Sequence, residues 1–482
     1  MLLAELLENL ADVKNDIEFS QIELDSRNIK KGDVFFAVVG HQQHGMQYAE
    51  AVIEQGAVAI VYDPAHEGQV IASELNFKNL IAIGDLSEKL GEIAGRFYVR
   101  PTEQLNVIGI TGTNGKTSCS QFLAQMMVST AVIGTLGSGL YGDLQTSNNT
   151  TPNAFDLQKL LAGFVRQGVK NVAMEVSSHG LEQGRVKAVN FSAAVFNNLS
   201  RDHLDYHGNM ENYFQAKKQL FKWPSLQFVV LNADDEYSKR IKFELNARVQ
   251  VLSYSLSNRS NEDLVAINIR YTAQGISCDV LWKKQCEALN VALLGEFNLQ
   301  NILAAMAVLL MQGYSLFESA LAASKVQPII GRMECFKAKN EALIVVDYAH
   351  TPDALKKVLM TLRQHCKKQL KVVFGCGGNR DIGKRGQIGH IAEQLADDII
   401  VTDDNPRFED SQSIIDAIVT GLDEQKISCI ADRETAIRQA IASSEKGDIV
   451  LIAGKGHEEY QEVNGIKTTF SDRALVQEII NR

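Results

Sequence analysis

VIGITGTNGKTS, at residues 107–118, joins a short apolar run to a glycine-rich turn and a Lys-Thr pair. The run Val107–Ile110 predicts a buried strand, and the residues from Lys116 to about Val128 predict a helix. In a parallel α/β sheet, the turn between a strand and the following helix lies at the carboxyl edge, where ligands bind. The stretch therefore predicts an α/β fold with a ligand site at this turn.

The residue types in this turn suit a bound nucleoside triphosphate. Gly112 and Gly115 allow backbone N–H groups to face an anion, Lys116 supplies positive charge, and the Thr117 hydroxyl can bind Mg²⁺. The general pattern G-x-x-x-x-G-K-[ST] begins with a glycine where this chain has Ile110, so Gly112 begins a shorter loop. The alternative is an ordinary Gly/Asn turn without a ligand. The predicted ATP contacts are Gly112, Thr113, Asn114, Gly115, Lys116, Thr117 and Ser118.

Composition excludes several classes of protein. The chain has 482 residues, of which 45% are hydrophobic, and 48 Lys and Arg against 58 Asp and Glu give a net charge of −10. This balance argues against broad binding to nucleic acid or to an anionic membrane. The longest apolar run, Ile302–Met311, is shorter than the roughly 20 residues that span a bilayer, and the first residues lack the basic start of a signal peptide. We expect a cytoplasmic protein with no nucleic-acid partner and no membrane insertion.

Short apolar runs alternate with helical stretches along the chain, which predicts α/β domains with mainly parallel sheets. Two boundaries can be argued. Pro101 disfavours helix at Arg100 before a new strand, and residues 327–332 separate a long helical stretch from another strand–helix series. The predicted segments are residues 1–100, 101–330 and 331–482. The predicted strands are Ala57–Tyr62, Val107–Ile110, Val172–Val176, Phe228–Asn232, Ile344–Asp347, Val372–Gly375, Ile399–Thr402 and Ile449–Ala453.

Charged residues follow the predicted strand Val172–Val176. Glu175 lies near its carboxyl end, at the edge that carries the phosphate loop, where it can share a Mg²⁺ with Thr117. A local cap is the alternative. Residues 202–208 read DHLDYHG, a polar loop that can hold a metal ion. Lys217 and Lys218 follow, and a solvated helix face is the alternative to a function there.

These motifs together resemble the Mur ligase family. TGTNGKTS resembles its ATP loop, which folylpolyglutamate synthetases share, and residues 202–205 and 213–217 match its D-H-x-D and Y-x-x-A-K motifs. The resemblance implies that His203 binds a second Mg²⁺ and that CO₂ carbamylates Lys217 to N6-carboxylysine. A carbamate is an anionic oxygen ligand, whereas an ammonium group would repel the metal. The implied catalytic residues are Lys116, His203 and Lys217, and the implied metal ligands are Thr117, Glu175, His203 and Lys217.

The first segment distinguishes branches of this family. LDSR at 24–27 and GHQQHG at 40–45 are similar to the UDP-binding domain of the branch that builds muramoyl tripeptides, a domain that folylpolyglutamate synthetases lack. NTT at 149–151 and QGR at 183–185 match the same branch, and a guanidinium suits a phosphate or carboxylate. The implied contacts to the UDP-linked substrate are Leu24, Ser26, His41, Gln42, Gln43, Asn149, Thr150, Thr151, Ser177, Gln183 and Arg185.

The last segment resembles the C-terminal domain of this branch in five motifs: GRME at 331–334, VDYAHTPD at 346–353, FGCGGNRD at 374–381, TDDNPR at 402–407 and AGKGHE at 453–458. DNPR marks members that add diaminopimelate, since an arginine fork can grip its second carboxylate. Asn379 stands where the family usually has aspartate in G-G-D-R, which we treat as minor because Arg380 is kept. The implied diaminopimelate contacts are Arg380, Asp404, Asn405, Pro406, Arg407, Gly454 and Glu458.

The resemblance implies an α/β ligase of three domains: a smaller α/β N-terminal UDP-binding domain, a central P-loop ATPase-type parallel-sheet domain and a Rossmann-like C-terminal domain. Its implied reaction uses ATP and Mg²⁺ to add meso-diaminopimelate to the D-Glu of UDP-N-acetylmuramoyl-L-Ala-D-Glu through an acyl phosphate, in peptidoglycan precursor synthesis. We expect a monomer. One rival is a family ligase that adds glutamate to folate or D-Ala-D-Ala to a muramoyl tripeptide, which LDSR and DNPR disfavour. The other is a P-loop switch or motor, which gives Lys217 and DNPR no role.

Overall fold

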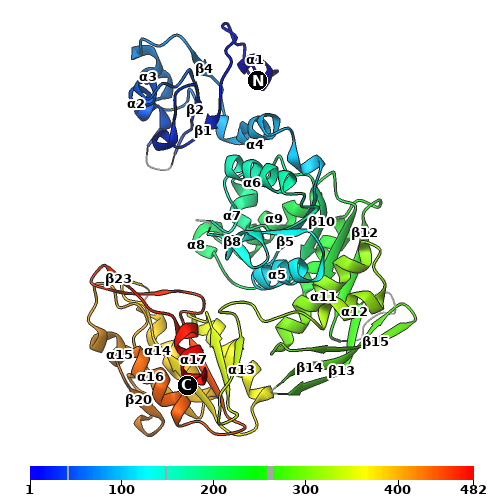
Figure 1. Cartoon of the computed structure of the whole chain (residues 1–482), viewed down its shortest axis with the longest axis vertical. Helices are drawn as coiled ribbons and strands as arrows, with labels where there is room; N and C mark the ends of the chain where they lie inside the picture. Colours follow the sequence, from blue (N-terminus) through cyan, green and yellow to red (C-terminus); the bar gives the residue numbers. More distant parts are fainter. Residues whose placement is uncertain (41–42, 147–148, 258–263, 273, 381, 482) are drawn as a thin grey trace. The chain divides into compact units, whose positions relative to one another are not determined.

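The computed structural model describes residues 1–481 except 41–42, 147–148, 258–263, 273 and 381. It divides the chain into two compact units, Met1–Tyr254 and Ser255–Arg482, drawn from blue to green and from green to red in Figure 1. Both units are α/β, as the sequence predicts. The three predicted segments, with edges near residues 100 and 330, remain a prediction.

The first unit begins with a parallel sheet in the order β1-β2-β3-β4. Alternate residues of β2 face opposite sides, because side chains alternate along a strand. Val34 and Phe36 join the cluster that includes Ile93 of α4, whereas Phe35 joins the cluster that includes Val52 of α2. The elements are α1 (Leu3–Leu6), β1 (Ile22–Glu23), β2 (Val34–Ala37), α2 (Ala49–Glu54), β3 (Ala59–Tyr62), α3 (Gly68–Glu74), β4 (Leu80–Ala82) and α4 (Leu86–Phe97).

A second sheet of this unit carries the phosphate loop. Its strands lie in the order β12-β11-β10-β5-β9-β6-β7-β8, parallel from β12 to β6 and antiparallel from there to β8. The strands are β5 (Asn106–Thr111), β6 (Thr130–Gly134), β7 (Gly137–Leu140), β8 (Asp143–Gln145), β9 (Asn171–Glu175), β10 (Phe191–Phe196), β11 (Phe228–Asn232) and β12 (Gln250–Ser255). The helices are α5 (Lys116–Met126), α6 (Ala154–Arg166), α7 (Ser178–Glu182), α8 (Leu204–His207), α9 (Met210–Lys218) and α10 (Glu236–Glu244).

The second unit begins with an antiparallel meander of β13 (Leu264–Thr272), β14 (Gly275–Trp282) and β15 (Gln285–Val291). Two helices follow, α11 (Glu296–Met311) and α12 (Leu316–Ala323), and α11 is buried along most of its length. His365, the last residue of α13 (Pro352–His365), joins this part to the next. Its Nδ1 lies 2.7 Å from Thr272 O, and its Nε2 accepts a hydrogen bond of 3.1 Å from Gly295 N.

The last sheet has the order β16-β17-β21-β18-β19-β20 and is parallel except for the pair β16–β17. Its strands are β16 (Glu334–Lys337), β17 (Leu343–Asp347), β18 (Leu370–Phe374), β19 (Asp398–Val401), β20 (Ile427–Cys429) and β21 (Ile449–Ala453), followed by the hairpin of β22 (Tyr460–Val463) and β23 (Ile466–Thr469). The helices are α13 (Pro352–His365), α14 (Lys384–Leu395), α15 (Ser411–Val419), α16 (Arg433–Ala442) and α17 (Asp472–Asn481).

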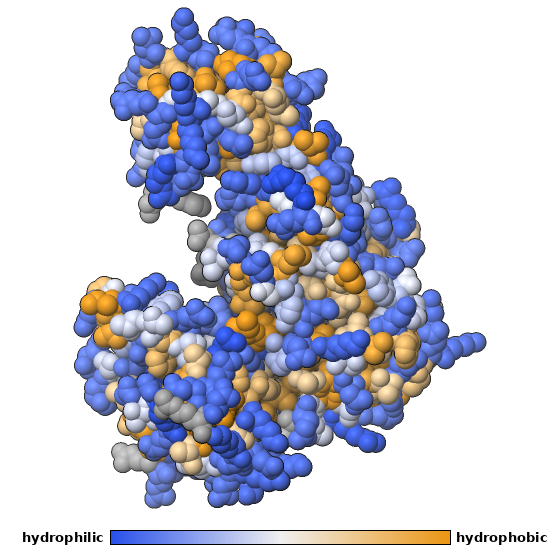
Figure 2. All heavy atoms as spheres, in the orientation of Figure 1, coloured by the Kyte–Doolittle hydropathy of each residue, from blue (hydrophilic) through white to orange (hydrophobic). Residues whose placement is uncertain are grey.

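Every strand predicted from the sequence coincides with a strand of the structure within one or two residues at each end, and the helix predicted after the phosphate loop is α5. Among the described helices, none is long and apolar enough to cross a membrane. On the face drawn in Figure 2, hydrophilic residues predominate and hydrophobic ones lie among them in small groups. This distribution agrees with the charged composition.

Candidate active site

The phosphate loop connects the buried end of β5 to the N-terminus of α5. Gly112 has φ +154° and Gly115 has φ +83°, values that residues with a Cβ rarely adopt. A Cβ on Gly112 would lie 3.1 Å from Asn197 Cβ, so the loop passes close to the end of β10. The loop is also tied there by a hydrogen bond of 2.9 Å from Asn114 N to Asn198 Oδ1. The two glycines therefore hold a tight turn over the first turn of a helix, a geometry that suits a phosphate.

Two lysines donate to the carbonyl groups of this loop. Lys116 Nζ lies 2.8 Å from Gly112 O and 2.9 Å from Thr113 O, and Lys217 Nζ lies 2.9 Å from Gly112 O. Lys217 is buried, and its Nζ lies 4.5 Å from the centroid of the Tyr213 ring. Burial, and then the charge of Lys116, lowers the pKa of Lys217 well below its usual value. An amine with a lowered pKa is more often neutral and able to react as a nucleophile.

Oxygen donors gather at the end of β9. Glu175 is fully buried and accepts hydrogen bonds of 2.9 Å from Thr117 Oγ1, 3.0 Å from Thr135 N and 3.1 Å from Thr135 Oγ1. Burial raises the pKa of Glu175, and the charge of Lys116 opposes this effect. A carboxylate and a hydroxyl within hydrogen-bond distance, beside a phosphate loop, are the ligand types that Mg²⁺ prefers. The structure thus brings together Thr117 and Glu175 as the sequence predicts.

His203, the third predicted metal ligand, lies at the start of α8. It has φ +51°, its side chain is about half exposed, and its Nε2 lies 3.4 Å from Asp202 Oδ2. Its ring centroid lies 6.0 Å from that of Tyr213, the ring beside Lys217. Among the residues that the structure describes, no group of three or more His, Cys, Asp or Glu side chains could by itself hold a metal ion. We call Gly112, Lys116, Thr117, Glu175 and Lys217 the phosphate-loop site.

Several residues predicted to contact the UDP-linked substrate lie together beside α7. Thr151 Oγ1 donates to Glu175 O at 2.9 Å and lies 3.1 Å from Ser177 Oγ. Arg185 donates to Gln183 Oε1 at 2.6 Å and 2.9 Å and to Thr151 O at 2.8 Å. Burial lowers the pKa of Arg185. These contacts order the guanidinium, so its position is set before a substrate binds.

The other residues predicted to contact this substrate make different contacts or lie outside the described chain. Thr150 Oγ1 lies 3.1 Å from Thr135 Oγ1, and Asn149 is exposed. Leu24 and Ser26 lie between β1 and β2, and Gln43 Oε1 accepts a hydrogen bond of 2.7 Å from the Tyr48 hydroxyl. His41 and Gln42 fall outside the described residues.

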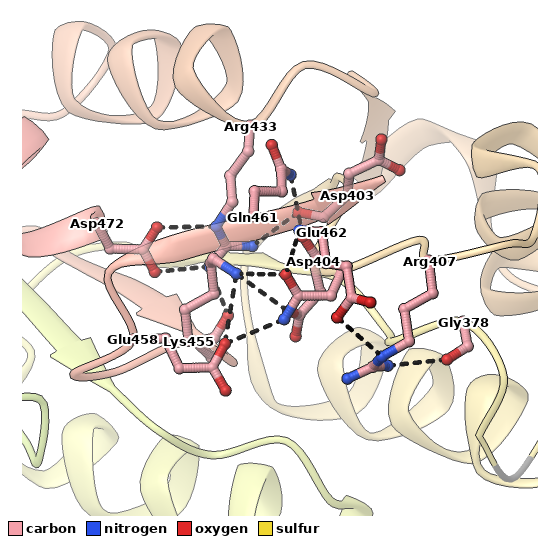
Figure 3. A network of polar contacts seen from close by, with 12 residues as sticks. Gly378, Asp403, Asp404, Arg407, Arg433, Lys455, Glu458, Gln461, Glu462 and Asp472 are labelled. Carbon is pink, nitrogen blue, oxygen red and sulfur yellow. Dashed lines mark hydrogen bonds and ion pairs between the residues drawn. The ribbon is translucent and has the colours of Figure 1, made fainter. Parts of the chain in front are cut away.

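The four central parallel strands of the last sheet bring its motifs to one edge. These strands lie side by side in the order β17-β21-β18-β19. At their carboxyl ends are, in the same order, the motifs that contain Asp347, Gly454, Gly375 and Thr402. Figure 3 shows the polar contacts there. Lys455 Nζ lies 2.9 Å from Asn405 Oδ1, 3.4 Å from Glu458 Oε2 and 3.6 Å from Asp404 Oδ1. We call Asp404, Asn405, Arg407, Lys455 and Glu458 the C-terminal network.

Arg407 is held at one side of this network. Its backbone has φ +54°, its Nη1 donates to Gly378 O at 2.8 Å, and its Nε lies 3.6 Å from Glu462 Oε2. A Cβ on Gly377 would lie 2.9 Å from Arg407 Nη1 and 3.7 Å from Arg380 Cγ, so both predicted arginines lie beside this glycine. A Cβ at this position would require the guanidinium of Arg407 to shift, whereas its distance to Arg380 would be an ordinary van der Waals contact.

Asn379 is the residue that departs from the family pattern. Its φ is +52°, a value that asparagine tolerates better than most residues, and its Oδ1 accepts a hydrogen bond of 3.1 Å from Phe408 N. Asn379 N donates to Glu409, which also accepts 2.8 Å from the buried Arg385. The side chain thus ties the glycine turn after β18 to the loop that carries Arg407.

Some residues of both sites were not predicted from the sequence. Lys455 lies within the quoted AGKGHE motif but was given no role, and Thr135 follows β6 without a recognisable pattern. Arg433 and Asp472, which are 39 positions apart in the chain, form a fully buried ion pair of 2.8 Å next to the C-terminal network. A motif search finds residues at fixed spacing, so it could have found Lys455 but not Arg433 or Asp472.

Comparison with known proteins places the chain in a class. Three family models match it: Mur ligase family, catalytic domain, over residues 18–98; Mur ligase middle domain over residues 110–309; and Mur ligase, glutamate ligase domain, over residues 331–456. The chain belongs to the Mur ligase family, and it is an ATP-dependent ligase that forms amide bonds.

Two of its similar relatives share one name. The proteins called UDP-N-acetylmuramoyl-L-alanyl-D-glutamate–2,6-diaminopimelate ligase in Pseudomonas aeruginosa and Chromobacterium violaceum are 44% and 43% identical to the chain, over 95% and 96% of its length and 94% of their own. A solved structure with that name is 36% identical, with a TM-score of 0.73, and covers 96% of this chain and 95% of its own. Crystal structure I of MurF from Acinetobacter baumannii, at 17% identity and a TM-score of 0.65, shares the fold alone.

Proposed function

We propose that the chain adds meso-diaminopimelate to the D-Glu of UDP-N-acetylmuramoyl-L-Ala-D-Glu, with ATP converted to ADP and phosphate, in the synthesis of peptidoglycan precursors. The name of its relatives supports the substrate pair. The single observation that carries the proposal within this chain is that Arg407, held by Gly378 O and Glu462, lies on the same loop as Asp404, whose carboxylate faces Lys455 together with that of Glu458. An arginine next to carboxylates suits an amino acid that ends in both a carboxylate and an ammonium group.

The phosphate-loop site is proposed to bind ATP through the residues of its turn. The backbone N–H groups after Gly112 and the N-terminus of α5 face the phosphates, and Lys116 turns from the loop carbonyls toward them. The oxygen donors fit Mg²⁺: Thr117 and Glu175 would hold one ion, His203 would bind a second, and a modified Lys217 would supply a further oxygen ligand. Bound Mg²⁺ would neutralise the charge that develops on the phosphates.

Lys217 is proposed to act as N6-carboxylysine. Its lowered pKa leaves the amine neutral more often, and the lone pair of Nζ can then attack the carbon of CO₂. A new N–C bond forms, and the electron pair of one C=O π bond moves onto its oxygen to give the carboxylate. A proton of the nitrogen leaves to solvent. The product is an anionic oxygen donor beside Lys116, which removes the repulsion between the two cations.

Amide formation is proposed to follow in two steps. A carboxylate oxygen of D-Glu attacks the γ-phosphorus, the bond to the ADP oxygen breaks, and an acyl phosphate remains. The amine of diaminopimelate then attacks the acyl carbon, and phosphate leaves from the tetrahedral intermediate. Positioning and charge neutralisation supply most of the rate in such transfers. The proposed acting form is a monomer in the cytoplasm, where ATP and the UDP-linked precursor are found.

A phosphate-release assay tests the proposal. The enzyme is incubated with ATP alone, with ATP and UDP-N-acetylmuramoyl-L-Ala-D-Glu, and with both plus meso-diaminopimelate. We expect sustained release only in the third mixture, with the tripeptide detected by mass spectrometry. Release that needs no amine would favour a nucleotide-driven switch. Release that needs folate with glutamate, or a muramoyl tripeptide with D-Ala-D-Ala, would favour another ligase of the family.

A further inference from the structure

Lys455 is a fully buried cation at the centre of the C-terminal network. Its side chain is 0% exposed and lies directly after β21, where Gly454 has φ +118°. A Cβ on Gly454 would lie 2.9 Å from Asp404 Oδ2, so the chain passes against the loop after β19 at this point. The cation therefore reaches the loop that carries Arg407 from the end of β21, although β18 separates β21 from β19 in the sheet (Figure 3).

Hydrogen bonds determine which way the side-chain amide of Asn405 faces. Its Oδ1 accepts 2.9 Å from Lys455 Nζ and 3.0 Å from Glu462 N, and its Nδ2 donates 3.0 Å to Glu458 Oε2. Lys455 and the backbone N–H can only donate, so they require the oxygen of the amide to face them. The amide nitrogen then faces Glu458. Lys455 and the backbone N–H of Glu462 together thus set the orientation of Asn405, and Lys455 and Asn405 both contact Glu458.

The same lysine balances the charge of the network. Asp404 and Glu458 each place a carboxylate oxygen within 3.6 Å of Lys455 Nζ. Asp404 and Glu458 face this one cation, while Arg407 pairs with Glu462, so one excess negative charge remains around Lys455, which suits an ammonium group of an incoming amino acid. Without the cation, both carboxylates would be buried with less compensation, which costs free energy and favours their rearrangement.

Arg433 fixes the backbone before Lys455 and before Asp404. Arg433 donates 3.0 Å to Ala453 O and 3.1 Å to Asp403 O, and it pairs with Asp472 through two contacts of 2.8 Å. This guanidinium joins the carboxyl ends of β19 and β21, the two strands that carry the network. Because those ends are held, the direction of the Lys455 side chain is set by the fold and does not depend on a ligand.

We propose that Lys455 is a positioning residue for the diamino acid, which orients Asn405 and Glu458 and neutralises one of the two carboxylates that would receive its ammonium group. The inference rests on the proposed function, since it concerns the amino acid that the C-terminal network binds. It adds a role for a residue that makes no proposed contact with the substrate. It also predicts that loss of Lys455 impairs one substrate selectively.

The experiment compares Lys455→Met with Lys371→Met. Lys371 is also buried, lies on β18 near the opposite edge of the same sheet, and has its Nζ 3.0 Å from Ser443 O and 3.2 Å from Asp398 Oδ2. Both variants replace a buried, paired lysine with an apolar side chain of similar length, so they control for general destabilisation. The KM for meso-diaminopimelate, ATP and UDP-N-acetylmuramoyl-L-Ala-D-Glu, the kcat and the Tm are measured for both and for wild type.

We expect Lys455→Met to raise the KM for diaminopimelate about 30-fold or more and to change the other two KM values less than about threefold. Lys371→Met is expected to lower the Tm and leave all three KM values near wild type. Lys455→Gln, which keeps a donor for Asn405 Oδ1, is expected to give an intermediate KM for diaminopimelate. If Lys455→Met does not fold, Lys455→Gln is compared with Lys371→Met in its place, and the same results would overturn the inference.

Three results would overturn the inference: a KM for diaminopimelate within threefold of wild type in the Lys455 variants, an equal rise of all three KM values, or the same selective rise in Lys371→Met. These outcomes are distinct from failure of the proposed function. If wild type does not use diaminopimelate at all, the proposed function fails. If wild type uses it and the Lys455 variants do so equally well, only the role of Lys455 fails.

Discussion

Lys217 and Lys455 are both buried, but they face different partners. Lys217 donates to a backbone carbonyl in the phosphate-loop site, beside a second cation, Lys116. Lys455 faces Asp404 and Glu458 in the C-terminal network. In the first site two cations lie together and their mutual repulsion can be relieved by an anion. In the second, the cation is matched to carboxylates of the same chain.

This difference separates a cation that can gain an anionic partner when a ligand binds from a cation that is already paired with carboxylates of the same chain. A buried cation near another cation is disfavoured and either loses its proton or gains an anion when one binds. A buried cation paired with a carboxylate leaves an uncompensated charge when its partner is removed, which destabilises the fold. Variants in the first site are therefore expected to affect mainly activity, and variants beneath the second to affect mainly stability.

The largest expected effect is that of Lys217→Ala. Synthesis is expected to fall below detection, because the variant lacks the group that CO₂ would modify. Short carboxylates such as acetate or formate are expected to restore part of it by supplying the missing oxygen ligand. Product formation measured with and without these additives checks this. Full activity of Lys217→Ala in CO₂-depleted buffer would refute the role of Lys217.

Arg433→Met is expected to destabilise the second unit by about 3–5 kcal/mol, since it leaves Asp472 buried without its guanidinium partner. Arg438→Ala on the same helix is the control. Arg438 pairs with Glu434 and Glu478 at the surface, so its loss is expected to cost at most about 1 kcal/mol. Urea unfolding of both variants measures the free energies. Equal losses would mean that the buried pair has no special structural role.

Lys116→Ala is expected to lower ATP-dependent turnover about 10²- to 10³-fold, because a positive charge aimed at the phosphates is lost. Binding of the UDP-linked substrate, measured by calorimetry, is expected to stay close to wild type, since its predicted contacts lie on other residues. The Tm is also expected to change little. Normal turnover in Lys116→Ala would show that the phosphate-loop assignment is wrong.

The smallest expected effect is a pH dependence of stability through His365. Burial lowers the pKa of His365, and the carbonyl of Thr272 opposes this effect. The unfolded chain, with a histidine pKa of about 6.5, therefore binds the proton first as the pH falls. The contribution of His365 to the free energy of unfolding is fully present above pH 6.5. It is lost as the pH falls from 6.5 to the pKa of His365 in the folded protein, at no more than about 1.4 kcal/mol for each pH unit.

His365→Gln isolates this contribution, because a glutamine amide can still accept from Gly295 N and donate to Thr272 O. Between pH 7.5 and 5.5, the variant is expected to lose less stability than wild type in urea unfolding, by at most about 1.4 kcal/mol. His457, whose pKa burial also lowers, keeps part of the dependence in both proteins. If the stability of His365→Gln depended on pH as that of wild type does, groups other than His365 would be responsible.

The sequence predicted the parts of the molecule that depend on local pattern. The apolar runs at Phe228–Asn232 and Ile449–Ala453 coincide with β11 and β21, because continuous buried strands of a parallel sheet have a strong signal. The meander β13–β15 was not predicted. Its strands alternate buried and exposed residues and contain several polar side chains, a pattern that is weaker than a continuous apolar run.

The same distinction holds for the candidate site. Lys116, Thr117 and Arg407 stand in motifs whose spacing is fixed by a turn, so their positions follow from the sequence. Thr135 reaches Glu175, and Arg433 reaches Asp472, only because the sheets bring distant segments together. Tertiary contacts of this kind leave no local pattern, and a single sequence cannot show them.

The most direct test of the central claim compares meso-diaminopimelate with L-lysine on wild type and on Arg407→Ala. Both amino acids share an aliphatic stem and an ammonium group, but only diaminopimelate carries the second carboxylate that Arg407 is proposed to grip. Rates of phosphate release at equal substrate concentrations are measured, with Arg438→Ala as an arginine control. We predict that wild type strongly prefers diaminopimelate. Arg407→Ala is predicted to lose about 2–5 kcal/mol of its transition-state stabilisation for diaminopimelate, with little change in the control. Equal use of lysine by wild type, or an Arg407→Ala variant that uses diaminopimelate as well as wild type does, would contradict the account.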